Sequence, residues 1–204
     1  YKRGKQDAAK FLKYEENVVE PTYQTLKAEL VDKNIFEPIA IYAYYPCISW
    51  DNKIYIFDKK YLFNSLEEAK NVPPLSEAIK VLEFPRQKRK PFRCIADFFA
   101  NDRLDVIAFT LASSGLKISD YERSLYDKGE FAKYYQVHGL GVELAEALAE
   151  VLHKQIRLDL DIVPKEGHTL NDVQMKQYVG CRYSPGYAAC PDLAMNRDIF
   201  DLLN

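Results

Sequence analysis

Hydrophobic positions recur at helical intervals in two parts of the chain. Residues 5–33 place apolar side chains among many charges, which predicts helix, and Pro21 is expected to start a second helix there because proline is tolerated in a first turn. Residues 141–160 give the strongest prediction, with a broad apolar face and a polar stripe of charges at steps of three and four. The stripe consists of Glu143, Glu146, Glu150, Lys154 and Arg157.

Short apolar runs between these helices predict strands. Residues 38–49 and 53–58 form the clearest hairpin, because residues 50–52 (Trp-Asp-Asn) supply turn chemistry between two strand-length runs. Residues 78–84 and 104–112 are two further predicted strands. The second lacks alternation of apolar and polar residues, so we expect it to be buried on both faces.

Local signals predict where shorter helices begin and end. Residues 65–68 and 119–122 each have the Ser-x-x-Glu pattern of a capping box, and Gly129 is expected to stop the helix that follows the second. Residues 169–172 are expected to cap a last short helix that ends before Gly180. Without repeats or a convincing linker, the pattern predicts a single α+β domain.

Composition and charge narrow the classes of function. The 204 residues are 48% hydrophobic with a formal net charge of −2, which argues against general nucleic-acid binding. No apolar run is long enough to span a membrane. The four cysteines form no CxxC pair and the three histidines are scattered, so we expect reduced thiols, a cytoplasmic protein and no metal site.

One dense basic run, PRQKRKPFR, occupies residues 85–93. Two interpretations remain open for it. The run is either a solvated loop or a docking surface for an acidic protein partner.

The sequence CRYSPGYAACPDL, residues 181–193, is the chain's most distinctive stretch. Arg182 offers a planar fork of donors for a carboxylate or phosphate, and Gly186 lets the backbone approach a ligand closely. Tyr187 adds a flat wall with a polar tip. From the residues alone, the stretch is either a ligand-gripping loop or a structural turn. Cys190 as a nucleophile would need an activating base, and none lies nearby in sequence, so we assign no catalytic residue.

This stretch resembles the signature of the activation (S-adenosylmethionine-binding) domain of cobalamin-dependent methionine synthase. Three more segments resemble that domain in the same order: FPRQ, CIADFF at residues 94–99, and HGLGVELAEALAEVLHKQIR at residues 138–157. The resemblance implies a bent antiparallel sheet flanked by helices, with one long central helix. Relative to the family pattern, residues 1–204 are expected to lack the first strand and a C-terminal segment.

The resemblance also implies a function. In this family, S-adenosylmethionine remethylates cobalamin that has been oxidised to cob(II)alamin, while flavodoxin or another reductase donates one electron. Cobalamin would be held by a separate domain or partner, so the expected partners are that cobalamin-binding domain and the reductase. The alternative hypothesis is a non-catalytic docking module that binds a corrinoid protein or flavodoxin and has lost the ligand.

The family pattern transfers ligand-binding roles to five positions. Arg182 matches the position that holds the ligand carboxylate, the backbone around Ser184 and Gly186 can hydrogen-bond the ligand, and Tyr187 can form a wall. Glu146 matches an acidic position suited to the sulfonium and ammonium groups; from the residues alone it is a solvated member of the polar stripe. Ala188 stands where the family usually has proline.

Overall fold

The computed structural model describes residues 7–162 and 179–204. Their contacts divide the chain into two compact units. The helical unit contains residues up to Ile39 together with Ala112–Leu148, and the sheet unit contains Ala40–Leu111 and the chain from Ala149 onward. The α+β class predicted from the sequence is confirmed, as are the antiparallel sheet and the long helix.

The helical unit begins with one nearly continuous helical segment. Helix α1 (Ala8–Tyr14) is followed by a π-helical turn (Glu15–Val19) and by α2 (Glu20–Asp32). The Asp7 side chain caps α1 by accepting hydrogen bonds from the first backbone amides. Pro21 lies in the first turn of α2, as predicted, where its missing N–H leaves no helical hydrogen bond unmade.

Helix α4 (Leu116–Asp127) follows Gly115, so the capping box predicted at residues 119–122 is wrong: those residues lie inside the helix. The predicted stop at Gly129 is confirmed. Gly129 has a φ of 75°, its amide donates to Tyr126 O (2.9 Å), and the next amide donates to Leu125 O (2.9 Å). This pair of bonds closes the last helical turn and favours glycine at the left-handed position.

Helix α5 (Phe131–Asp159) begins ten residues before the predicted start at residue 141, and it includes Gly139 and Gly141. Gly141 permits close packing: a Cβ there would lie 2.7 Å from Cδ1 of Ile118 on α4. Residues of α2, α4 and α5 form the core of the helical unit. The buried members are Leu26, Leu30, Ile118, Leu125 and Val137.

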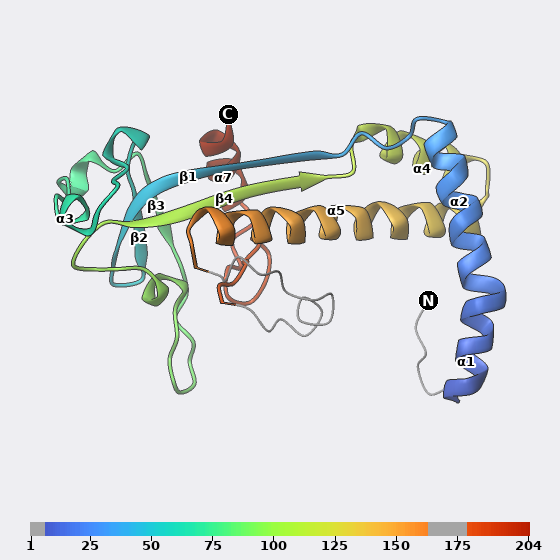
Figure 1. Ribbon diagram of the computed structural model, residues 1–204, viewed down its shortest axis with the longest axis horizontal. Coiled ribbons are helices and arrows are strands. Elements are labelled where there is room, and N and C mark those ends of the chain that lie inside the picture. Colours follow the sequence, from blue (N-terminus) through green and yellow to red (C-terminus); the bar gives the residue numbers. More distant parts are fainter. Residues whose placement is uncertain (1–6, 163–178) are drawn as a thin grey trace. The chain divides into compact units, whose positions relative to one another are not determined.

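The sheet unit contains four strands in the order β3-β2-β1-β4: β1 (Ile39–Trp50), β2 (Lys53–Ile56), β3 (Lys80–Glu83) and β4 (Asp105–Ser113). Figure 1 shows β1 and β4 side by side and running in opposite directions. The predicted hairpin is confirmed. Strand β2 pairs only with the last four residues of β1, from Cys47 to Trp50, across a tight turn in which Asp51 has a φ of 56°.

Strand β4 differs from its prediction. Only Ile107 and Phe109 are buried, and these two side chains share one face because strand residues alternate. The expectation that β4 is buried on both faces is therefore wrong. Ile107 and Phe109 contribute to the main core of the sheet unit, together with residues of β1, β2 and β3 and of the segments that follow the sheet.

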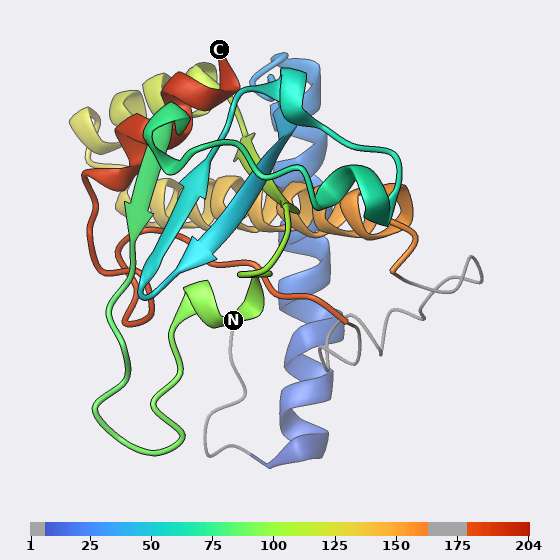
Figure 2. The same cartoon turned by 90° about the vertical axis from the view of Figure 1, so that its left-hand side faces the viewer.

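Helix α7 (Met195–Leu203), which the sequence reading did not predict, packs on this core through Met195 and Leu202. The Tyr45 hydroxyl donates to Leu202 O at 2.5 Å. Lys80 on β3 makes ion pairs with Asp198 (2.6 Å) and Asp201 (3.1 Å), and Figure 2 shows α7 next to that strand. These contacts fix the end of the described chain onto the sheet.

Short helical elements connect the strands. They are α3 (Leu66–Ala69) and the 3₁₀ turns Lys59–Tyr61, Leu75–Glu77 and Ile95–Phe98. At α3 the predicted capping contact forms, since Ser65 Oγ accepts from Glu68 N at 3.2 Å, but Glu68 Oε2 accepts from Asn64 N rather than from Ser65 N. The last short helix predicted after residue 169 lies outside the described residues.

No helix among residues 7–162 and 179–204 combines the length and the apolar character needed to cross a membrane.

Two glycines of the helical unit give a matched test of this description. Gly139→Ala should raise the free energy of unfolding by about 0.5–1 kcal/mol, because a methyl group there meets open space inside α5 and alanine favours helix. Gly129→Ala should lower it by about 1 kcal/mol, because the left-handed backbone is strained for alanine. Urea unfolding of both variants measures the two signs; a stabilised Gly129→Ala would contradict the helix stop.

Candidate functional site: the loop from Gly180 to Cys190

The distinctive stretch folds as a tight loop, called here the ligand loop (residues 180–190). The Gly186 amide donates to Cys190 O at 2.8 Å, and the Cys190 amide donates to Tyr187 O at 2.9 Å. Gly186 has a φ of 99°, and a Cβ there would lie 2.9 Å from Cδ2 of Leu193. Glycine is therefore required on two counts, the backbone conformation and the space.

Cys190 anchors one end of the ligand loop in the main core of the sheet unit. Its side chain is 3% exposed, and its thiol donates to the Met195 sulfur at 3.4 Å. Burial raises the pKa of the Cys190 thiol, and the negative charge of Asp192 adds to this. A buried, protonated thiol is a poor nucleophile, so the geometry argues against thiol catalysis at this position.

The other end of the ligand loop lies against the last turns of α5. A Cβ on Gly180 would be 3.5 Å from Nε2 of His153 and 3.8 Å from Cδ of Arg157. Arg182 Nη2 makes an ion pair with Glu150 Oε1 at 2.7 Å, and both side chains are about three-quarters buried. Glu150, His153 and Arg157 are spaced by three and four residues, so they share one face of α5.

The polar contacts on this face of α5 are buried. Arg157 is 1% exposed, and its Nη1 lies 2.8 Å from Nδ1 of His153, which is 6% exposed. Burial, together with the positive charges of Arg157 and Arg182, lowers the pKa of His153 to about 4. At neutral pH the ring is therefore uncharged, and Nδ1 accepts the hydrogen bond from the Arg157 guanidinium.

Four of the five predicted site residues lie together in the ligand loop. Arg182 is mostly buried, whereas Ser184 is exposed and Tyr187 is 71% exposed. Glu146 is also exposed, but it lies on α5 one turn before Glu150 and within the helical unit. The structure thus groups Arg182, Ser184, Gly186 and Tyr187 and leaves the role of Glu146 a prediction.

The sequence predicts Glu150 and Arg157 as members of a solvated polar stripe, and it indicates no functional role for His153. Arg157 is fully buried, so the stripe is wrong at that position. The spacing of residues 150, 153 and 157 indicates a shared face, but only packing reveals that the ligand loop covers it.

The arrangement suits a small ligand that carries a carboxylate. Arg182 brings a guanidinium to the loop, the backbone at Gly186 has no side chain in the way, and Tyr187 exposes a flat ring beside it. Within residues 7–162 and 179–204 no group of three or more His, Cys, Asp or Glu side chains could hold a metal ion. The chemistry available here is recognition of an organic molecule through main-chain groups and one cation.

Comparison with known proteins gives consistent matches. Residues 6–204 match the family described as "Vitamin B12 dependent methionine synthase, activation domain". Methionine synthase of Mycobacterium tuberculosis is 34% identical over 176 residues, and that of Mycobacterium leprae is 35% identical over 176 residues. Each alignment covers 80% of this chain and 14% of the relative, so the chain spans a small part of these proteins.

A solved structure has a similar fold. The crystal structure of the MetH reactivation domain bound to AdoHcy gives a TM-score of 0.73 at 24% identity, covering 94% of this chain and 60% of that one. At this identity the likeness concerns the fold.

The low pKa of His153 predicts an acid-dependent loss of stability. Below pH 6.5 the unfolded chain binds a proton at this histidine, but the folded chain does so only near pH 4. Stability should therefore fall as the pH drops through that window, by on the order of 2 kcal/mol. In His153→Asn, whose amide oxygen can replace Nδ1 as acceptor, urea unfolding from pH 7 to pH 4 should show a smaller fall. His138→Asn, at an exposed position of α5, is the matched control; an unchanged pH slope in His153→Asn would contradict the assignment.

Proposed function

We propose, because this chain belongs to the family of vitamin B12-dependent methionine synthase activation domains, that it binds S-adenosylmethionine for the reductive reactivation of cobalamin. The observation that carries the proposal is the ligand loop, in which Arg182, Ser184, Gly186 and Tyr187 lie within six consecutive residues. The structural neighbour that shares the fold is described as bound to AdoHcy, the demethylated form of this ligand.

The residues of the loop fit the methionyl end of such a ligand. Arg182 would bind the carboxylate through its fork of donors, and main-chain groups from Ser184 to Gly186 would hydrogen-bond the ligand. The Tyr187 ring would form one wall. Glu146 remains the proposed partner of the positively charged sulfonium or ammonium group.

We assign Glu150 a positioning role. Its carboxylate holds Arg182 Nη2 at 2.7 Å and fixes one edge of the guanidinium. The uncharged state of His153 also matters, because a protonated ring would add a third positive charge beside Arg157 and Arg182. Glu150, His153 and Arg157 would thus hold Arg182 in place without themselves contacting the ligand.

When bound, S-adenosylmethionine supplies an activated methyl group, and the chain's own task is to hold and orient it. The proposed acceptor is cob(II)alamin, carried by a separate domain or partner, and the electron comes from flavodoxin or another one-electron reductase. Cob(II)alamin held there would accept the methyl group, the reductase would supply the electron, and S-adenosylhomocysteine would be the other product, while Arg182, Ser184, Gly186 and Tyr187 hold S-adenosylmethionine. The methyltransferase activity belongs to the complete methionine synthase.

Substituting Arg182 tests ligand binding directly. Arg182→Ala should weaken S-adenosylmethionine binding at least about 30-fold, because losing charge-assisted hydrogen bonds to a carboxylate costs about 2 kcal/mol or more. Isothermal titration calorimetry with the wild type and the variant measures this. Arg197→Ala, at an exposed arginine on α7, is the matched control and should bind like the wild type.

If Arg182→Ala binds as tightly as the wild type, the ligand loop is not the site. If neither protein binds S-adenosylmethionine, the proposal fails, and the docking module without ligand becomes the better description of this domain.

The positioning role of Glu150 predicts a different pattern. Glu150→Gln keeps the size of the side chain but weakens the ion pair, so it should reduce affinity about threefold to tenfold, and only in the presence of Arg182. In a double-mutant cycle, adding Glu150→Gln to Arg182→Ala should have no further effect on the titration. Equal effects of Glu150→Gln in both backgrounds would show that Glu150 does not act through Arg182.

A further inference from the structure

An open hollow of about 650 Å³ lies in the sheet unit, and its lining shares no residue with the ligand loop. The lining comes from three segments: residues 49–51 at the turn between β1 and β2, Arg86 after β3, and residues 97, 99 and 101 in and after the 3₁₀ turn Ile95–Phe98. The proposed function uses none of these side chains. The hollow is therefore a separate candidate site.

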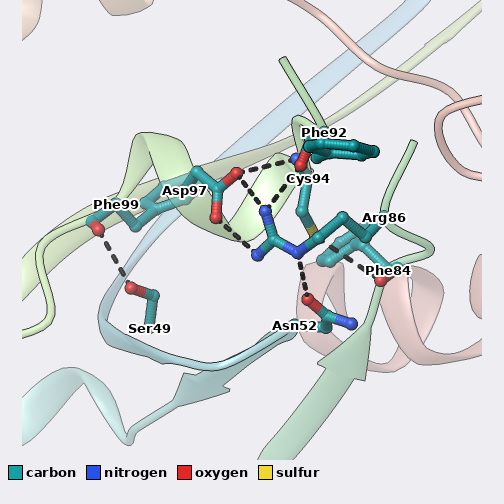
Figure 3. Close-up of polar contacts among 8 residues, drawn as sticks. All are labelled: Ser49, Asn52, Phe84, Arg86, Phe92, Cys94, Asp97 and Phe99. Atoms are coloured by element: carbon teal, nitrogen blue, oxygen red, sulfur yellow. Dashed lines mark hydrogen bonds and ion pairs between the residues drawn. The ribbon is translucent and has the colours of Figure 1, made fainter. Parts of the chain in front are cut away.

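Arg86 joins the three segments (Figure 3). Its two Nη atoms each donate a hydrogen bond to the Asp97 carboxylate, both 2.7 Å, and its Nε donates to Asn52 Oδ1 at 3.0 Å. Arg86 Nη1 also donates to Phe92 O at 2.8 Å. The hydrogen bonds between Arg86 and Asp97 raise the pKa of the guanidinium and lower that of the carboxyl, so both groups stay charged and neutralise each other. Arg86 thus holds the hollow together, and its charge is already matched.

Ser49 fixes another part of the lining. It is 6% exposed, its amide donates to Ala100 O at 2.9 Å, and its hydroxyl donates to Phe99 O at 3.0 Å, as Figure 3 shows for the second bond. The half-buried Phe99 side chain packs against the main core of the sheet unit. These contacts hold residues 49 and 99 in place, so the hollow is formed before any ligand enters, as is usual for small-molecule sites.

Trp50 and Asp51 give the hollow its exposed ring and its unmatched charge. Trp50 is 63% exposed and is the only tryptophan in the chain. Asp51 is exposed, and its carboxylate makes no ion pair with any residue that the structure describes. The lining contains two carboxylates and one guanidinium. Because Asp97 neutralises Arg86, the remaining negative charge belongs to Asp51.

We propose that this hollow binds a small organic cation of the quaternary ammonium or methylated amine class. The face of the Trp50 indole attracts such a cation through its quadrupole, and the Asp51 carboxylate attracts it through charge. The exposed Asn101 amide oxygen is a further acceptor for an N–H or O–H group of the ligand. An anion is disfavoured, because the guanidinium in the lining is taken up by Asp97. The proposal goes beyond the proposed function and does not depend on the ligand loop.

The test uses choline as the cation and 3,3-dimethylbutan-1-ol as its uncharged counterpart of the same shape. Because Trp50 is the only tryptophan, its fluorescence reports on the hollow directly. We expect a saturable change in fluorescence with choline at constant ionic strength, and about tenfold weaker binding of the uncharged alcohol. In Trp50→Leu, broadening of the choline trimethyl resonance in the presence of the protein should be largely lost.

The charge of Asp51 is tested by Asp51→Asn. Asparagine also adopts the left-handed conformation that residue 51 has, with a φ of 56°, so the turn should be kept. The variant should bind choline about threefold to fivefold more weakly and the uncharged alcohol as the wild type does. Asp127→Asn, which removes one charge from an exposed position of α4, is the matched control and should bind choline like the wild type.

Four results would overturn the inference. The first is a wild-type protein that shows no saturable response to choline, and the second is equal affinity for choline and the uncharged alcohol. The third is an equal loss in Asp51→Asn and Asp127→Asn, which would show a general effect of net charge. The fourth is weaker S-adenosylmethionine binding by Asp51→Asn, which would place that ligand in the hollow.

The same variants separate this site from the ligand loop. Asp51→Asn should bind S-adenosylmethionine like the wild type, and Arg182→Ala should bind choline like the wild type. Failure of one proposal is therefore distinguishable from failure of the other.

Discussion

The close packing of the ligand loop against α5 determines the geometry of the candidate site. Gly180 lies so near His153 and Arg157 that a larger residue would contact their side chains, and Arg182 then reaches Glu150. Burying Arg157 beside a histidine is favourable only if the ring stays uncharged, and the low pKa of His153 meets that condition. The position of the ligand loop against α5 and the uncharged state of His153 therefore depend on each other.

Two exposed loops of the sheet unit, residues 87–93 and the ligand loop, share a hydrophobic core. Cys94, directly after the first loop, and Cys190, at the end of the ligand loop, belong to the same cluster of buried residues as Ile54, Phe84 and Met195. Both loops consequently begin and end on rigid structure although their exposed parts contact little. Loops that carry recognition residues on a fixed scaffold are a general arrangement in proteins.

Local patterns predicted much of this fold, because hairpins, helix stops and apolar periodicity depend on residues close in sequence. The β1–β2 turn and Gly129 are examples. Predictions failed where tertiary packing decides. The helix predicted over residues 141–160 begins at Phe131, and Arg157, predicted to lie on a polar stripe, is buried. The residues of the ligand loop could be predicted from the family resemblance. The face of α5 that carries Glu150, His153 and Arg157 could be identified only from the structure.

Exposure of the cysteines has a practical consequence. Cys47, Cys94 and Cys190 are buried, and Cys181 is the exposed one, directly before Arg182 in the chain. A thiol-reactive fluorophore should therefore attach at a single place in the native protein, with no engineered residue. Its emission would report on the surroundings of the neighbouring guanidinium, so the sequence already contains an optical sensor position for whatever the loop binds.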